Sequence, residues 1–538
     1  MSRASAPDTL GRVLAEQAER LGERPLLTWA GRQWSYGTMN ALANRLANGL
    51  AARGVGKGSI VALMLPNVPE FLATWFALSK LGAVEAPVNT ALRGQSLVHV
   101  LGDIGAPTLI AGREYLEEIA RVAERMPPIA EVIVFDRDGE GVVPAGFPFP
   151  TTPFAELLEG AAREPDVEVR SQDVMAIMHT SGTTGLSKGV MLCHRHQYVL
   201  ARNVATRVGM TQDDVVFSCL PYFHNMAQAL LAYPALQVGA RVAMVERFSA
   251  KHFWREIRES ASTMLIFIGS MLAILLKQPP APDDRRHHLR LGFGVPLPAD
   301  TYRDFRARFG VELVSGYGST EASMVAFTPP GNPKPESAGR VLPSYEVRIV
   351  DEEDQEVTRG VMGQLVLRPR TSWITFLGYH GQPEAAVAAW RNLWFHTGDA
   401  AVMDEEGFLH FRDRIKDVIR RRGENISSVE VESVVNLHPS VLTAAALAVP
   451  SEVGEDEVKI VVVPREGVSI DPAAIVAHCE EHLPYFAVPR YVEVRDALPL
   501  TPTQRVEKRK LRDEGVTPAT WDREAAGYQL RRTARVTR

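Results

Sequence analysis

Cysteine is scarce in this chain: Cys193, Cys219 and Cys479 are the only three among 538 residues, and they lie far apart. An odd number of distant cysteines indicates neither a disulfide framework nor a zinc site. Long apolar runs are also lacking. The longest, residues 264–276, is interrupted by a Gly-Ser pair and is shorter than the ~20 residues of a membrane-spanning helix. The N-terminus lacks the basic-then-apolar layout of a signal peptide.

A strong charge of either sign is missing as well. The net charge of −5 gives no reason to expect nucleic acid or an anionic membrane as a partner. Charged residues make up 23% and hydrophobic residues 46%, which is typical of a globular protein. A chain of 538 residues is too long for one ordinary core, so two or more domains are expected. We therefore expect a cytoplasmic enzyme; the oligomeric state, a homodimer included, stays open.

Strands and helices alternate through the first 315 residues or so. Leu42, Leu46 and Leu50 share one helix face, and the strand 59–65, the helix 70–81 and further strands follow. Such units predict parallel sheets with helices on their faces. Residues 139–170 are rich in Pro, Gly and Glu and are predicted to be a connecting loop.

The pattern of predicted elements changes after Pro329. Short strands at 346–350, 364–368 and 408–412, separated by acidic or Gly turns, predict a small antiparallel barrel or sheet. The last part of the chain mixes the helix 428–437 with strands, and its roughly 120 residues are enough to fold independently.

The segment 178–190, MHTSGTTGLSKGV, is the densest run of hydroxyl and glycine residues. Hydroxyls and exposed backbone amides can surround phosphate oxygens, and a lysine adds full charge. Its spacing is not that of the common nucleotide P-loop, and a flexible Ser/Gly linker is the alternative reading. The residues concerned are Thr180, Ser181, Gly182, Thr183, Thr184, Gly185 and Lys188.

A second motif, Tyr317-Gly-Ser-Thr320-Glu321, follows a predicted strand. Loops at the carboxyl ends of strands are where open α/β sheets bind ligands. Tyr317 can stack on a purine, and Glu321 can hold Mg²⁺ beside a triphosphate. The alternative is an ordinary turn with an exposed glutamate.

Two further motifs lie close together. Trp394-Phe-His-Thr-Gly-Asp399 ends in a carboxylate that can accept two hydroxyl hydrogen bonds, as a ribose requires. Asp413-Arg414-Ile-Lys416-Asp417 follows; a charge run of this kind by itself usually marks a solvated surface.

In this order, the motifs resemble those of the adenylate-forming superfamily, which includes acyl-CoA synthetases, aryl-CoA ligases, luciferases and peptide-synthetase adenylation domains. The similarity covers about Met178 to Lys508 and implies a large N-terminal domain of two α/β sheets plus a small β-barrel, with a mobile α+β C-terminal domain. The domains would be 1–414 and 415–538, with the hinge near Lys416.

The resemblance also implies roles for single residues. Lys188 and the loop would bind phosphates, Thr320 and Glu321 would belong to the adenine and magnesium motif, and Asp399 with Arg414 would bind ribose. Lys416 would be the pivot, and Gly423 would approach the pantetheine of CoA. Gly294, within Gly-Phe-Gly-Val-Pro, would form the opposite wall of the adenine slot, although this run departs from the small residues usual in the family. His224, after Tyr-Phe, would lie beside the acyl carboxylate; a satisfied core histidine is the alternative.

One position differs from the family pattern. Relatives carry TGK in a C-terminal loop whose lysine acts in adenylation, whereas Thr503-Gln-Arg505-Val-Glu-Lys508 places Arg505 there. Arginine keeps the charge but is a planar fork and not a flexible point charge. Either Arg505 or Lys508 would then act, and a basic surface turn is the remaining interpretation.

The activity that this resemblance implies is ATP- and Mg²⁺-dependent activation of a carboxylic acid to an acyl-adenylate, followed by transfer to CoA. The overall pattern is most similar to crotonobetaine/carnitine-type and medium-chain acyl-CoA ligases. The alternatives are a carrier-protein or amine acceptor, a small oxyanion such as nitrite as the activated acid, and a catalytically silent nucleotide-binding paralogue.

Overall fold

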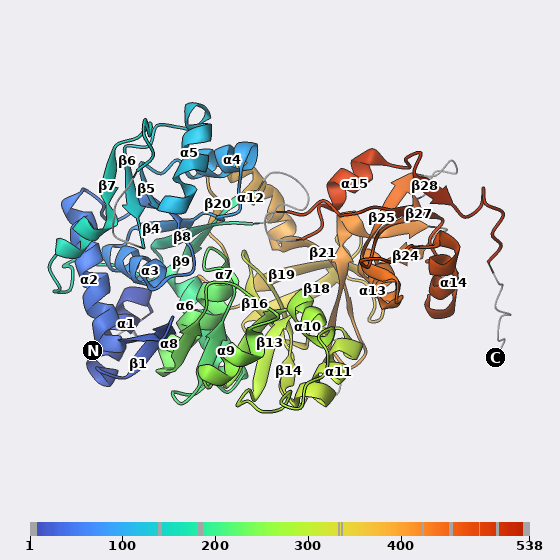
Figure 1. Cartoon of the computed structure of the whole chain (residues 1–538), viewed down its shortest axis with the longest axis horizontal. Helices are drawn as coiled ribbons and strands as arrows, with labels where there is room; N and C mark the ends of the chain where they lie inside the picture. Colours follow the sequence, from blue (N-terminus) through green and yellow to red (C-terminus); the bar gives the residue numbers. More distant parts are fainter. Residues whose placement is uncertain are drawn as a thin grey trace.

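The computed structural model describes residues 8–137, 143–180, 187–331, 334, 337–421, 424–450, 456–483, 485–501 and 505–530. Figure 1 shows a large body and, beside it, a smaller lobe that carries β24 (Glu424–Ile426) and the elements after it. The mixed α/β architecture expected from the sequence is confirmed. Within the described ranges, no helix combines the length and the apolar character that a membrane crossing needs.

The first sheet of the body has eight strands. The strands that follow one another through βα units pair in parallel, as the alternating pattern predicts, and β8 and β9 form an antiparallel pair. The predicted loop 139–170 is wrong in part, because it contains β7 at the sheet edge and the short helix η3 (Phe154–Glu159). The spatial order is β20 (Gly378–Tyr379), β9 (Gly189–Cys193), β8 (Val174–His179), β4 (Val84–Pro87), β3 (Ile60–Met64), β5 (Thr108–Gly112), β6 (Glu131–Phe135) and β7 (Thr151–Pro153).

The second sheet has seven strands, parallel except for the hairpin of β1 and β2. The longest apolar run of the sequence is accounted for here, because it forms the buried strand β12 and the helix α10 (Gly269–Leu276). The order is β14 (Glu312–Val314), β13 (Leu291–Val295), β12 (Met264–Ile268), β10 (Val215–Ser218), β11 (Arg241–Met244), β1 (Pro25–Trp29) and β2 (Arg32–Ser35).

The two sheets share one hydrophobic core. The helix α3 (Pro69–Leu81) is buried on all sides from Phe71 to Leu81, as expected of a helix that is enclosed within a core. The other helices of the body are α1 (Leu10–Leu21), α2 (Tyr36–Ala52), α4 (Gly94–Ile104), α5 (Leu116–Val122), α6 (His194–Arg207), α7 (Asn225–Ala227), α8 (Tyr233–Val238), α9 (Phe253–Glu259), α11 (Ala299–Phe309) and α12 (Pro383–Ala389).

The antiparallel part expected after Pro329 is present. Four strands pair in the order β18 (Tyr345–Val350), β19 (Gly363–Pro369), β21 (Phe395–Met403) and β22 (Leu409–Arg414). A smaller sheet joins β15 (Gly316–Ser319), β16 (Ser323–Phe327) and β17 (Arg340–Val341).

The smaller lobe has hydrophobic clusters of its own, formed by residues from Ile419 to Leu511. Its elements are β23 (Ile419–Arg421), β24, α13 (Ser428–Leu437), β25 (Val441–Pro450), β26 (Asp456–Pro464), α14 (Pro472–His482), β27 (Tyr491–Val494), α15 (Lys508–Glu514) and β28 (Thr520–Asp522). This core contains no residue of the body, as expected of a unit that can fold independently.

Candidate active site

The side chain of Asp399 is the centre of the best-defined polar cluster. Asp399 and Arg414 face each other in the register of β21 and β22, and the Arg414 guanidinium lies 2.9 Å from Oδ1 of Asp399. The Tyr317 hydroxyl, from β15, donates to Oδ2 at 2.5 Å. Asp399 is only 3% exposed. Burial raises the pKa of Asp399, and Arg414 and then Tyr317 oppose the rise by stabilising the ionised form.

Aromatic and glycine residues surround this cluster. The rings of Tyr317 and Phe411 are stacked with centroids 6.2 Å apart. Gly294 has no room for a side chain, since a Cβ there would lie 2.0 Å from the carbonyl oxygen of Phe267. Gly318 is restricted in the same way by the carbonyl oxygen of Ser323, at 2.2 Å. Flat apolar surfaces beside a carboxylate suit a purine nucleoside.

A second group gathers around Tyr379, which the sequence reading did not select. Tyr379 lies in β20, whose pairing with β9 brings it to the residues that follow the hydroxyl-rich loop. The Lys188 ammonium is 4.8 Å from the Tyr379 ring centroid, and the Tyr379 hydroxyl donates to Oε1 of Glu321 at 3.2 Å. Thr320, beside Glu321, is half-buried. A single carboxylate at this position fits Mg²⁺ that is held mainly by substrate phosphates.

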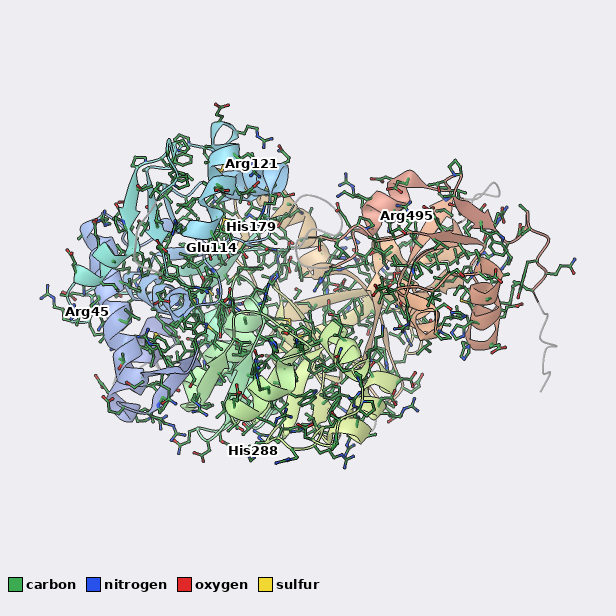
Figure 2. All side chains as sticks on the ribbon, in the orientation of Figure 1. Arg45, Glu114, Arg121, His179, His288 and Arg495 are labelled. Atoms are coloured by element: carbon green, nitrogen blue, oxygen red, sulfur yellow. The ribbon has the colours of Figure 1, made fainter. Side chains whose placement is uncertain are left out.

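The stems of the hydroxyl-rich loop are held by α4. His179, at the end of β8, lies 2.9 Å from Asp103, and His99 lies 2.7 Å from the carbonyl oxygen of Ser187. The Thr180 amide donates to the Lys188 carbonyl at 3.2 Å. Figure 2 places His179 on the body and Arg495 on the smaller lobe. The predicted phosphate-binding residues Ser181, Gly182, Thr183 and Thr184 lie outside the described residues.

The aromatic–histidine element lies where β10 ends. Burial and then the positive charge of Arg505 lower the pKa of His224 to about 4, so this imidazole is neutral near pH 7. Arg505 comes from the smaller lobe, where the chain reverses between Thr501 and Arg505. Its charge also interacts with those of Arg414 and Asp399. The structure thus brings Arg505 to the same site as His224 and Asp399.

Lys508, the alternative cation, is engaged inside the smaller lobe. Its ammonium lies 2.8 Å from Glu432 and also contacts the Ser428 hydroxyl. Of the two predicted candidates, Arg505 is therefore the one that faces the body in this structure. Lys416 falls within the short helix η6 (Ile415–Asp417), between the body and the lobe, and the predicted Gly423 lies outside the described residues.

Comparison with known proteins identifies the family to which both parts of the chain are similar. The family model described as "AMP-binding enzyme" matches residues 14–380, and the model "AMP-binding enzyme C-terminal domain" matches residues 430–505.

Named relatives resemble the chain over most of its length. It is 31% identical over 499 residues to the crotonobetaine/carnitine–CoA ligase of Salmonella paratyphi A, covering 89% of this chain and 93% of that protein. The crystal structure of ATP-bound MatB from Rhodopseudomonas palustris matches with a TM-score of 0.83 and 27% identity, over 94% of this chain and 98% of that one. The o-succinylbenzoate–CoA synthetase of Bacillus subtilis, in complex with its acyl-adenylate, matches with a TM-score of 0.80 and 26% identity, over 94% and 99%.

Proposed function

The chain belongs to the family of AMP-binding enzymes, which form adenylates, and on this premise we propose that it is an AMP-forming acid–CoA ligase. The observation that carries the proposal is the position of Asp399. This buried carboxylate is held by Tyr317 and Arg414 at the edge of the body, within the electrostatic range of Arg505 from the smaller lobe. A ribose-binding group and a cation for the reacting oxyanions thus meet where the two parts of the chain face each other.

In the first half-reaction, an oxygen of the carboxylic acid attacks the α-phosphorus of ATP. The bond to the bridging oxygen breaks, pyrophosphate leaves, and an acyl-adenylate remains. Asp399 would bind the ribose hydroxyls. Lys188 and the loop that contains Thr180 would bind the phosphates. Glu321 would hold Mg²⁺, which neutralises phosphate charge when bound. Most of the rate comes from positioning and electrostatics, because no residue acts as a covalent nucleophile.

Near the acid, His224 and Arg505 have different roles. His224 is neutral near pH 7, so it can donate a hydrogen bond to the substrate carboxylate but adds no charge. Arg505 supplies the positive charge that the neutral imidazole lacks and can bind an oxyanion through two N–H groups. This division is our reason for assigning adenylation to Arg505 in place of the usual lysine.

In the second half-reaction, the thiol of CoA attacks the acyl carbon and AMP leaves. The two steps need different groups at one site, so we propose that residues 415–538 rotate as a unit against residues 1–414, with Lys416 as the pivot. Rotation would withdraw Arg505 and bring the segment around Gly423 toward the pantetheine. A cytoplasmic location is part of the same proposal, because ATP and CoA are supplied there.

The test is to follow pyrophosphate, AMP and thioester with a panel of acids, each with and without CoA. Crotonobetaine and carnitine belong in the panel because of the relatives, beside medium-chain fatty acids. We expect pyrophosphate when ATP, the acid and CoA are all present. We expect AMP only when CoA is added. Pyrophosphate release without consumption of CoA would mean that the acyl group is transferred to another acceptor. No release with any acid would leave a nucleotide-binding protein without this activity.

A further inference from the structure

A buried carboxyl–amide contact lies behind the aromatic–histidine element. Glu85, in β4 of the first sheet, and Gln228, the first residue of the π-helical turn η4 (Gln228–Ala232), are each 1% exposed. Nε2 of Gln228 donates to Oε1 of Glu85 at 2.9 Å and to the carbonyl oxygen of Tyr222 at 2.8 Å. One amide thus joins a strand of the first sheet to the segment that follows β10 in the second.

Tyr222 is held from its other side as well. Its backbone amide donates to Oδ1 of Asn67 at 3.0 Å, and Nδ2 of Asn67 donates to the carbonyl oxygen of Leu220 at 3.0 Å. Both polar backbone groups of this fully buried residue are therefore held by side-chain amides, one from Gln228 six residues later and one from Asn67 in a distant part of the chain. His224 follows two residues later, and its amide donates back to the Pro221 carbonyl at 3.1 Å. The backbone that presents His224 has little freedom as long as Gln228 stays in place.

Two oxygens in this arrangement have no hydrogen-bond partner among the described residues. Within the part of the chain that the structure describes, neither Oε2 of Glu85 nor Oε1 of Gln228 has a hydrogen-bond partner, although both are buried. An ionised carboxylate only accepts hydrogen bonds, so it would leave both oxygens unsatisfied at a considerable cost. A carboxylic acid has one O–H donor, and a proton on Glu85 directed at Gln228 satisfies the two oxygens together.

The electrostatic surroundings point the same way. Burial raises the pKa of Glu85 to about 8, and the hydrogen bond from Gln228 opposes that rise. The carboxyl group is thus mostly protonated at neutral pH.

We propose that Glu85 and Gln228 form a two-bonded carboxyl–amide pair, closed by a proton on Glu85, that positions Tyr222 and His224 for reaction with the acid. Glu85 is a positioning residue, since it acts through Gln228 and does not touch substrate. The link to catalysis rests on the role proposed above for His224.

The test compares Glu85→Gln with Glu85→Leu. Glutamine offers a donor and an acceptor where the carboxylic acid has them, so kcat/KM for the acid should stay within about threefold of the wild type. Leucine removes both bonds and leaves one N–H and the Oε1 of Gln228 without the partner that Glu85 provides, so kcat/KM should fall about tenfold or more, in line with the loss of a buried hydrogen bond. The dissociation constant of ATP should be unchanged in both variants.

Two spectroscopic readouts do not depend on turnover. The infrared spectrum of the wild type should contain the C=O band of a protonated buried carboxyl, and Glu85→Gln should lose it. The NMR signal of the His224 ring, assigned by its loss in His224→Gln, should move in Glu85→Leu and not in Glu85→Gln.

Several outcomes would overturn the proposal. They are absence of the infrared band, equal damage by glutamine and leucine, or a leucine variant as active as the wild type with an unmoved His224 signal. Should Glu85→Leu fail to fold, the band and the activity of Glu85→Gln still decide. Should no acid be activated, the proposed function fails, whereas the band and the His224 signal still test the pair.

Discussion

Replacing Arg414 by glutamine should move the acid side of the pH–rate profile upward. Asp399 must be ionised to accept hydrogen bonds from both ribose hydroxyls, and burial already raises its pKa. Arg414, 2.9 Å away, is the strongest influence that holds this pKa down. Without that charge the pKa of Asp399 rises further, so the carboxylate is lost at a higher pH as the solution is acidified.

The size of this shift follows from the geometry. Unit charges in contact at a protein surface interact by about 4 kcal/mol at an effective dielectric constant of roughly 20. The Arg414 side chain is 41% exposed, whereas that of Asp399 is 4% exposed. Screening at the exposed partner reduces the value to about 2 kcal/mol, which corresponds to roughly 1.5 pH units.

The assay is initial pyrophosphate release at subsaturating ATP and saturating acid, measured across the acid and neutral range. Arg414→Lys is the matched control, since it keeps a charge near Asp399 and should move the acid limb much less. If Arg414 acted only on the phosphates, Arg414→Gln would lower the rate by one factor at every pH. An acid limb that stays in place would therefore refute the reasoning.

Substitutions at four other positions give distinct expectations. Tyr379→Phe keeps the ring beside Lys188 but removes the hydrogen bond to Glu321, so pyrophosphate release should fall about tenfold. In Tyr379→Ala the rate of pyrophosphate release should fall further, because the cation–π contact is lost as well. Equal effects of the two substitutions would mean that the ring contact is unimportant. Lys188→Ala should depress pyrophosphate release by about 100-fold or more, because the charge on the phosphates is no longer stabilised by the lysine. The control is that the variant is as stable as the wild type. Arg505→Lys should retain adenylation of ordinary carboxylates, and a large gain in rate would indicate that the native loop is poorly suited to them. Lys416→Pro should slow thioester formation and spare pyrophosphate release, whereas equal loss of both would argue against a pivot there.

Sequence reasoning succeeded where the signal is local. The helix that carries Leu46 and the strands around it follow from hydrophobic periodicity and from the glycines that interrupt it, because these properties act within a few residues. The motif residues Tyr317, Glu321 and Asp399 could be named for the same reason, since each stands in a short segment of unusual composition. The loop predicted for residues 139–170 was wrong in part, because an edge strand such as β7 is short and takes its stability from its neighbour β6.

The sequence by itself determined the types of element, their order, and which short segments carry chemistry. Only the tertiary structure decided which of these segments meet. Tyr317 and Asp399 are 82 residues apart, yet they share a hydrogen bond. Glu85 and Gln228 are 143 residues apart and come from a strand and a helical turn. Tyr379, in a strand of only two residues, donates a hydrogen bond to Glu321. Local composition specifies whether a segment is strand or helix and which face is apolar. It does not specify which strands lie side by side, because that depends on how all the apolar faces of the chain are buried at once.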